Sequence, residues 1–212
     1  MGAVTNPPAT TPAQPVPLWN IANVLTMLRI VLVPVFAWLF LLDGDAARLW
    51  STAVFAVAAA TDKLDGHLAR SRGLVTDFGK LADPIADKAL VITALVLLSV
   101  DGLLPWWVTV VIVVRELGIT ALRSYLKRRD YVMAASRGGK LKTTLQVAFI
   151  LMLLVPRQAF VPSGVADFVD LLAWIVVLAT VAVTLLTGID YVVKALQIVR
   201  GQERAGERDP SA

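Results

Sequence analysis

The sequence contains no cysteine, which excludes disulfides, thiolate metal sites, cysteine nucleophiles and S-palmitoylation. Charge is also scarce: 17% of the residues are charged and 57% are hydrophobic, whereas about a quarter of the residues in a soluble domain are normally charged. Apart from the single histidine, His67, any metal would have to be held by oxygen atoms. These shortages predict a membrane protein whose metal sites, if it has any, use oxygen ligands.

Lysine and arginine are missing from the first 17 residues, which are rich in proline, alanine and threonine. This segment therefore lacks the charged start of a secretory signal. Its Met-Gly opening has Asn6 where a myristoylation site requires serine or threonine. We expect residues 1–17 to be a disordered cytoplasmic tail, residues 18–200 to be one transmembrane catalytic domain, and residues 201–212 to be a polar cytoplasmic tail.

Six apolar stretches are long enough to cross a bilayer as helices, because about 17 to 25 residues span its hydrocarbon core. The connections between them are short, so consecutive helices should pack antiparallel. The predicted fold class is an all-α membrane protein with six transmembrane helices. The expected spans are residues 20–42, 49–68, 81–100, 105–126, 141–161 and 165–196.

The basic residues predict the orientation, because short cytoplasmic connections carry most of the positive charge. Most of the 20 lysines and arginines follow the second span, surround the connection between the fourth and fifth spans, or end the chain. Both termini should therefore be cytoplasmic, in the plasma membrane. The opposite connections hold Arg48 and Arg157 together with Asp43, Asp45, Asp101, Asp167 and Asp170.

Acidic residues gather where the second span ends and the third begins. Ionisable groups within apolar helices are costly and by default mark a functional site. Two antiparallel helices joined by a short connection can direct four carboxylates to one point, because residues three or four apart share a helical face. The set comprises Asp62, Asp65, Gly66, Ala69 and Arg70 on one helix and Gly79, Asp83 and Asp87 on the next.

Four clustered carboxylates require a cation, since two unit charges 4 Å apart repel by about 4 kcal/mol at an effective dielectric constant of 20. Oxygen ligands favour Mg²⁺ or Mn²⁺, and four carboxylates can hold two ions about 3.5 to 4 Å apart. Gly66 and Gly79 would let a ligand approach closely, and Arg70 suits phosphate. The residues predict metal-assisted attack on a diphosphate. The alternative is that the acids only pair with lysines and arginines at solvated helix ends.

The complete pattern Asp62-x₂-Asp65-Gly66-x₂-Ala69-Arg70-x₈-Gly79-x₃-Asp83-x₃-Asp87 resembles the signature of the CDP-alcohol phosphotransferase family, with no departure at any position. The resemblance covers about residues 18–196. It implies the six-helix fold of that family, a homodimer, and two metal ions bound by Asp62, Asp65, Asp83 and Asp87, with Asp87 also the catalytic base. The residues that it implies for binding the CDP-lipid are Gly66, Ala69, Arg70, Thr76, Gly79, Asn23 and Thr26.

A second polar set lies in the fourth span and at the start of the fifth. Arg115 and Glu116 are costly inside an apolar helix unless they are used, although a buried Arg–Glu pair that only locks two helices is the alternative. Together the basic residues of this set could surround a phosphate, which favours a phosphomonoester acceptor over a neutral alcohol such as choline. The predicted acceptor-phosphate residues are Arg115, Arg123, Ser136, Lys140 and Lys142.

The strings PIADK (84–88), RE (115–116) and GKLKT (139–143) resemble the phosphatidylglycerophosphate synthase branch of the family, as does the opening segment with Asn23, Thr26 and Arg29. This resemblance implies transfer of a phosphatidyl group from CDP-diacylglycerol to sn-glycerol 3-phosphate, giving phosphatidylglycerol phosphate and CMP in phospholipid biosynthesis. Two alternatives stay open. One is a sibling enzyme acting on inositol 1-phosphate or phosphatidylglycerol, and the other is a cation transporter. Membrane lipids, not nucleic acid, are the expected surroundings.

Overall fold

The computed structural model describes residues 20–71, 76–128, 131 and 137–206. Within the helices, it describes side chains except at residues 22, 62–71, 77–81, 83, 127, 137–140, 158 and 199–206. These ranges contain six α-helices, one 3₁₀ turn and no strand, which confirms an all-helical chain with six helices. The elements are α1 Ile21–Leu41, α2 Asp45–Ser71, α3 Asp77–Val100, α4 Trp106–Lys127, α5 Arg137–Leu154, η1 Arg157–Ala159 and α6 Ser163–Gly206.

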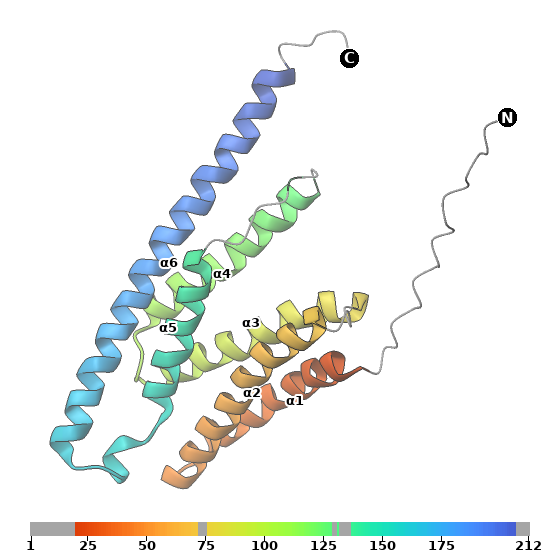
Figure 1. Ribbon diagram of the computed structural model, residues 1–212. Helices are drawn as coiled ribbons and strands as arrows, with labels where there is room; N and C mark the ends of the chain where they lie inside the picture. Colours follow the sequence, from red (N-terminus) through yellow and green to blue (C-terminus); the bar gives the residue numbers. More distant parts are fainter. Residues whose placement is uncertain (1–19, 72–75, 129–130, 132–136, 207–212) are drawn as a thin grey trace.

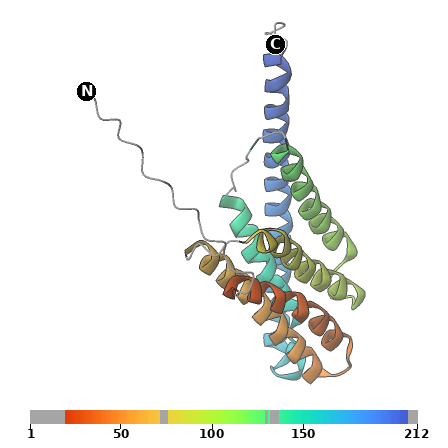
Figure 2. The same cartoon turned by 90° about the vertical axis from the view of Figure 1, so that its right-hand side faces the viewer.

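The helices form two groups joined by α5 (Figure 1). In the first group α1 packs against both α2 and α3, and in the second α6 packs against α4 and α5. The helix α5 also contacts α2 and α3, and α3 contacts α4. Figure 2 shows the same grouping from the side, with α6 standing as the longest helix. The C-terminal ends of α1, α3 and α5 lie toward one end of the bundle, and the C-terminal ends of α2 and α4 lie toward the other.

The core lies where the two groups meet. Phe36 of α1 and Phe55 of α2 are fully buried, with ring centroids 5.5 Å apart. Fully buried small residues, Ala58 of α2, Ala94 of α3 and Ala173 of α6, occupy the same apolar cluster. Small side chains allow helix backbones to approach closely, which is how helices pack in an apolar solvent that offers no hydrophobic driving force.

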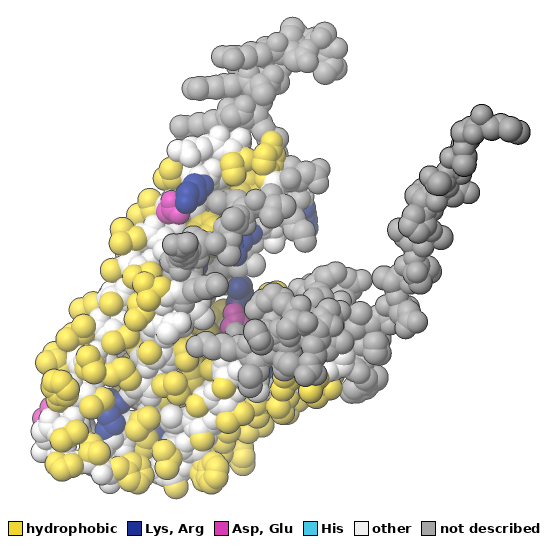
Figure 3. All heavy atoms as spheres, viewed as in Figure 1, with side chains coloured by type: hydrophobic (Ala, Val, Ile, Leu, Met, Phe, Trp, Pro, Cys, Tyr) yellow, Lys and Arg dark blue, Asp and Glu magenta, His cyan; other side chains and the backbone are white. Residues whose placement is uncertain are grey.

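Large apolar side chains also cover the outer faces of the helices (Figure 3). Trp38 of α1 is 63% exposed and Leu186 of α6 is 68% exposed. Soluble proteins rarely expose apolar surface so continuously. In the described part of the chain, Asn23–Leu41 and Ser163–Ile198 are long and apolar enough to cross a membrane, and α5 contains a shorter apolar stretch, Leu141–Leu154. That all six helices cross the membrane stays a prediction.

Two predicted helix boundaries were wrong or incomplete. The fifth helix ends at Leu154 rather than at residue 161, because Pro156 lacks a backbone N–H and restricts the residue before it. The sixth begins at Ser163, directly after Pro162, and continues to Gly206, well past the expected end at residue 196 and into the predicted polar tail. The predicted N-terminal tail, residues 1–17, lies outside the described residues.

Candidate active site

The aspartate pattern lies on the facing ends of two consecutive helices. The helix α2 contains Asp62 and Asp65 and ends at Ser71, while α3 begins at Asp77 and contains Asp83 and Asp87. The two helices contact each other, and residues 72–76 join them. The structure therefore brings the backbones of the predicted ligands to one end of the bundle.

The side chains of several predicted site residues lie outside the described residues. Asp87 is described and is half-buried. Among the described side chains no group of three or more histidines, cysteines, aspartates and glutamates could hold a metal, but that set omits three of the four predicted ligands. The predicted site residues that lie outside it are Asp62, Asp65, Gly66, Ala69, Arg70, Gly79, Asp83, Ser136 and Lys140.

Polar residues of α1 lie against Thr76, the residue directly before α3. The hydroxyl of Thr76 donates a hydrogen bond of 2.8 Å to the side-chain oxygen of Asn23, and both residues are buried. The backbone N–H of Asn23 in turn bonds the side chain of Asn20, the N-cap of α1, at 3.0 Å. Thr26, three residues further along α1, is also buried. The structure thus brings Asn23 and Thr76 together and buries Thr26 on a helix that packs against α2 and α3.

Arg29, three residues beyond Thr26, is fully buried. A buried guanidinium carries five N–H donors, and its burial is tolerated only where acceptors satisfy them. In the sequence, Arg29 is part of the opening segment that resembles the phosphatidylglycerophosphate synthase branch, and no role was predicted for it. A single arginine inside an otherwise apolar span was the signal that it belongs to the polar interior of the bundle.

A network of polar and charged side chains connects α4 to α5 and to α6. Lys142 of α5 forms an ion pair with Glu116 of α4, and its side chain is 4% exposed. Arg115 donates to Glu116 at 3.4 Å and to the hydroxyl of Thr187 in α6 at 3.0 Å. A Cβ on Gly188 would lie 3.4 Å from the Arg115 side chain, an ordinary van der Waals distance, so α4 and α6 pack closely at this crossing. The structure therefore brings Arg115 and Lys142 together. The Arg115–Glu116 pair lies within α4, and the ion pair that joins two helices is the one between Lys142 and Glu116.

Arg123 contacts α6 two turns further along α4. It donates a hydrogen bond to the hydroxyl of Tyr191, and its guanidinium lies 4.8 Å from the centroid of the same ring. Sequence reasoning missed Thr187 and Tyr191 because neither is charged. The available signal was their spacing of four residues, which places two polar side chains on one face of an apolar helix.

The aspartate end and the basic network are close in space. Lys142 is close enough to interact electrostatically with Asp87 and Lys88 of α3, as well as with Arg115. Gln146, one turn beyond Lys142, is buried, and its side-chain nitrogen has no hydrogen-bond partner among the described residues. In Figure 3, basic and acidic side chains lie in a hollow between the two helix groups. The predicted base and the predicted acceptor cations thus share one neighbourhood.

Asp190 of α6 lies outside this network. It is exposed and pairs at 2.7 Å with Lys194, four residues along the same helix. Exposed pairs of this kind contribute little to stability. Asp190 is therefore a useful reference position for tests of the buried acids.

The chain matches the CDP-alcohol phosphatidyltransferase family over residues 19–196. It is 47% identical over 185 residues to the "Probable phosphatidylglycerophosphate synthase" of Mycobacterium tuberculosis strain H37Rv, covering 86% of this chain and 84% of the relative. It is 37% identical over 176 residues to the "CDP-diacylglycerol--glycerol-3-phosphate 3-phosphatidyltransferase" of Bacillus subtilis, covering 77% and 91%. A relative of the same name in Salmonella typhimurium is 41% identical over 157 residues, covering 71% and 85%.

Proposed function

The chain belongs to the CDP-alcohol phosphatidyltransferase family, and on this premise we propose that it transfers the phosphatidyl group of CDP-diacylglycerol to sn-glycerol 3-phosphate, giving phosphatidylglycerol phosphate and CMP. The names of relatives that align over most of their length support this donor and acceptor. One observation on the chain itself carries the assignment of the acceptor. Lys142 pairs with Glu116 of α4 and interacts electrostatically with Arg115 and with Asp87 of α3, so a cation suited to a phosphate lies near the predicted base.

The oxygen ligands available at the α2–α3 end fit the divalent metal on which this family generally depends. Carboxylate oxygens are the ligands that Mg²⁺ and Mn²⁺ prefer, and the helices that carry the four aspartates contact each other. Asp62, Asp65, Asp83 and Asp87 would hold two such ions. When bound, the metal would neutralise negative charge on the diphosphate and lower the pKa of the acceptor hydroxyl.

The chain's own residues bind the substrates and move one proton. Asp87 accepts the proton of the glycerol 1-hydroxyl, whose oxygen then forms a bond to the β-phosphorus of the CDP-lipid while the bond from that phosphorus to the CMP oxygen breaks. Arg115, Arg123 and Lys142 hold the acceptor phosphate, assisted by Ser136 and Lys140. Positioning and charge stabilisation supply most of the acceleration in such phosphoryl transfers. The CDP-lipid is bound by Gly66, Ala69, Arg70, Thr76, Gly79, Asn23 and Thr26.

Glu116 keeps this acceptor site assembled before the phosphate arrives. Three cations close together would repel one another in a site with little water. Glu116 accepts from both Lys142 and Arg115, and the hydroxyl groups of Thr187 and Tyr191 hold the two arginines. The incoming phosphate therefore meets donors that are already oriented, which reduces the entropy lost on binding.

The proposal places all six helices across the plasma membrane, with both termini and the active site on the cytoplasmic side, and two copies in a homodimer. The exposed apolar side chains and the concentration of basic residues at the α2–α3 and α4–α5 end support this orientation. Because the chain has no cysteine, single cysteines report topology directly. In intact cells, an impermeant maleimide should label Asp167→Cys but not Lys194→Cys. Equal labelling of both would contradict the orientation.

An acceptor panel tests the reaction. Purified protein with CDP-diacylglycerol and Mg²⁺ is supplied with sn-glycerol 3-phosphate, inositol 1-phosphate or phosphatidylglycerol, and CMP release is measured. We expect release with sn-glycerol 3-phosphate and only background release with the other two. Preference for either of the others would identify a sibling enzyme, and cation flux into proteoliposomes without CMP release would identify a transporter.

A further inference from the structure

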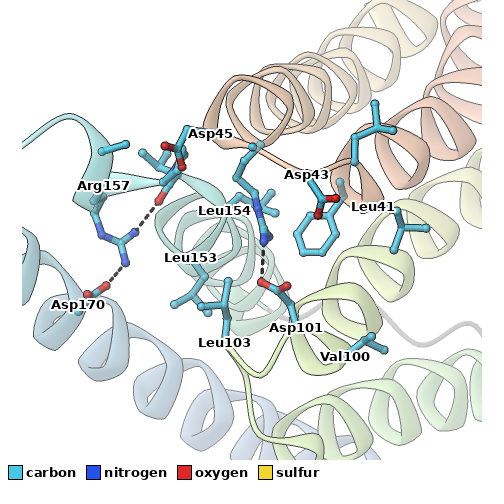
Figure 4. A pocket seen from close by; sticks show the side chains of 17 residues that line it. Leu41, Asp43, Asp45, Val100, Asp101, Leu103, Leu153, Leu154, Arg157 and Asp170 are labelled. Carbon is cyan, nitrogen blue, oxygen red and sulfur yellow. Dashed lines mark hydrogen bonds and ion pairs between the residues drawn. The ribbon is translucent and has the colours of Figure 1, made fainter.

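A cavity of about 500 Å³ lies at the end of the bundle opposite the aspartate pattern (Figure 4). The α1–α2, α3–α4 and α5–η1–α6 connections all contribute to its wall. Its size falls within the range of about 300 to 1,000 Å³ that is usual for small-ligand sites. The proposed reaction uses none of its residues, so the cavity needs a separate explanation.

Two arginines supply donors for an anionic group. Arg48 donates to Asp101 at 2.6 Å and lies 4.0 Å above the Phe40 ring, and Arg157 pairs with Asp170. Each guanidinium keeps one buried nitrogen, Nη1 of Arg48 and Nε of Arg157, without a hydrogen-bond partner among the described residues. Buried unpaired donors are costly. An oxygen acceptor inside the cavity, such as a phosphate, would satisfy them.

The rim of the cavity favours a cationic group as well. Asp43 and Asp45 are exposed, and no partner for either is found among the described residues. Four lining carboxylates face two guanidinium groups, which leaves a formal excess of two negative charges. In Figure 4, Asp45 and Arg157 lie on one side and Asp43 and Asp101 on the other, with Leu103 and Leu153 between them. A ligand with only negative charge would be repelled. A ligand with a phosphate and an ammonium can pair with both the arginines and the aspartates of the cavity.

The surroundings point to a lipid as the source of this ligand. Leu41 and Leu103 line the cavity and are also exposed on the apolar outer surface. At the same end, Trp50, Trp106 and Trp107 are exposed near the starts of α2 and α4, where tryptophans mark the membrane–water interface. If the helices cross the membrane as proposed, the cavity opens at the depth of the lipid headgroups.

We infer that this cavity binds the headgroup of a zwitterionic membrane lipid that carries a phosphate and a primary ammonium, as phosphatidylethanolamine does. The phosphate accepts from the arginines, the ammonium donates to one of the two rim carboxylates, Asp43 or Asp45, and an acyl chain follows the leucines. The inference rests on the proposed membrane crossing but not on the proposed chemistry, since the cavity and the aspartate pattern lie at opposite ends.

Native mass spectrometry of the full-length protein in detergent tests this site. The protein is offered equal amounts of phosphatidylethanolamine, phosphatidylcholine and phosphatidylglycerol with identical acyl chains. We expect phosphatidylethanolamine to be retained about three to ten times better than phosphatidylglycerol, because the rim contacts are exposed charge pairs of modest strength. Equal retention of the three lipids would overturn the inference. So would equally effective competition by soluble phosphoethanolamine, because a lipid source requires the apolar wall.

A double variant separates this cavity from the active site, which itself accepts an anionic lipid. Asp43→Asn with Asp45→Asn should abolish the preference, while Asp167→Asn, an exposed acid at the same end that does not line the cavity, should keep it. A preference unchanged in the double variant would contradict the assignment. Both variants should release CMP at the normal rate. Loss of CMP release from the unmodified protein would instead refute the proposed function and leave the lipid result unaffected.

Discussion

The two ends of the bundle contain the same kinds of charged side chain in different balance. At the α2–α3 end, Arg115, Arg123 and Lys142 are held by one glutamate, a threonine and a tyrosine across three helices. At the opposite end, each arginine has its own aspartate, and further carboxylates are left over. The cations of the acceptor site suit a phosphorylated acceptor. The excess of acids around the opposite cavity disfavours a ligand that carries only negative charge, so the balance of charge separates the acceptor site from a site for a zwitterion.

The largest expected difference between the ends follows from Asp87→Asn. If Asp87 is the base, turnover should fall about 10²- to 10⁴-fold, which is the usual contribution of general base catalysis. The rate of CMP release at saturating substrates measures this, and Asp190→Asn on the surface of α6 is the matched control with no expected effect. Near-normal turnover by a variant that still binds metal would show that the base assignment is wrong.

A smaller but selective effect is expected from Arg115→Ala. The loss of a charge-assisted hydrogen bond, about 1.5 to 3 kcal/mol, should raise the KM for sn-glycerol 3-phosphate about 10- to 100-fold while the KM for CDP-diacylglycerol changes little. Lys142→Ala should act similarly but also removes the ion pair between α5 and α4 and leaves Arg115 as the remaining partner of Glu116, so its unfolding midpoint must be measured as well. Equal increases in both KM values would exclude an acceptor-phosphate site.

Tyr191→Phe should have a weaker effect at the same end. The ring stays next to Arg123 but the hydroxyl is lost, and a hydrogen bond of about 0.5 to 1.5 kcal/mol corresponds to a rise of about two- to tenfold in the acceptor KM with kcat preserved. Thr187→Val should raise the acceptor KM by a similar factor, because it removes the hydroxyl that accepts from Arg115. Thr180→Val is the control on the same helix, since its hydroxyl donates to the Val176 carbonyl of α6 itself. If Thr180→Val raised the acceptor KM equally, α6 would not position the arginines.

The smallest effect is expected from Arg48→Ala at the opposite end. This variant loses a partly exposed ion pair and a contact with the Phe40 ring, together about 1 kcal/mol. The unfolding midpoint should fall by about 2 to 4 °C, as for other chains of this size, while the acceptor KM stays unchanged. A change in that KM would link the two ends and contradict their independence.

The sequence predicted the features that depend on spacing along one helix. The six long apolar stretches and their short connections predicted the number of helices. The positions of the aspartates at the end of one stretch and the start of the next predicted that they lie on two consecutive helices, where the structure has them. The end of α5 was also predictable, since Pro156 interrupts an apolar run that composition alone would continue to residue 161. The predicted end was wrong because it followed the hydrophobicity of the segment and not the helix-breaking effect of proline.

Features that depend on how helices cross could not be predicted in the same way. Thr187 and Tyr191 became part of the candidate site only because α6 packs against α4 at the level of Arg115 and Arg123. The charges of the other end were read only as evidence for orientation, because they lie in three separate connections. Their convergence around one cavity is a property of the tertiary structure, and no local pattern encodes it.

The length of α6 has a mechanical consequence. Its apolar stretch, Ser163–Ile198, has 36 residues and would extend about 54 Å as a helix, against a hydrocarbon core of about 30 Å. Such a mismatch is relieved by tilting, and the tilt changes with bilayer thickness. Thr187 and Tyr191 lie in this stretch and hold the two arginines. If α6 crosses the membrane as proposed, we expect a change in lipid chain length to reach the proposed acceptor site through α6. The acceptor KM measured in nanodiscs of short and long lipids would report this coupling, and an identical KM in both would exclude it.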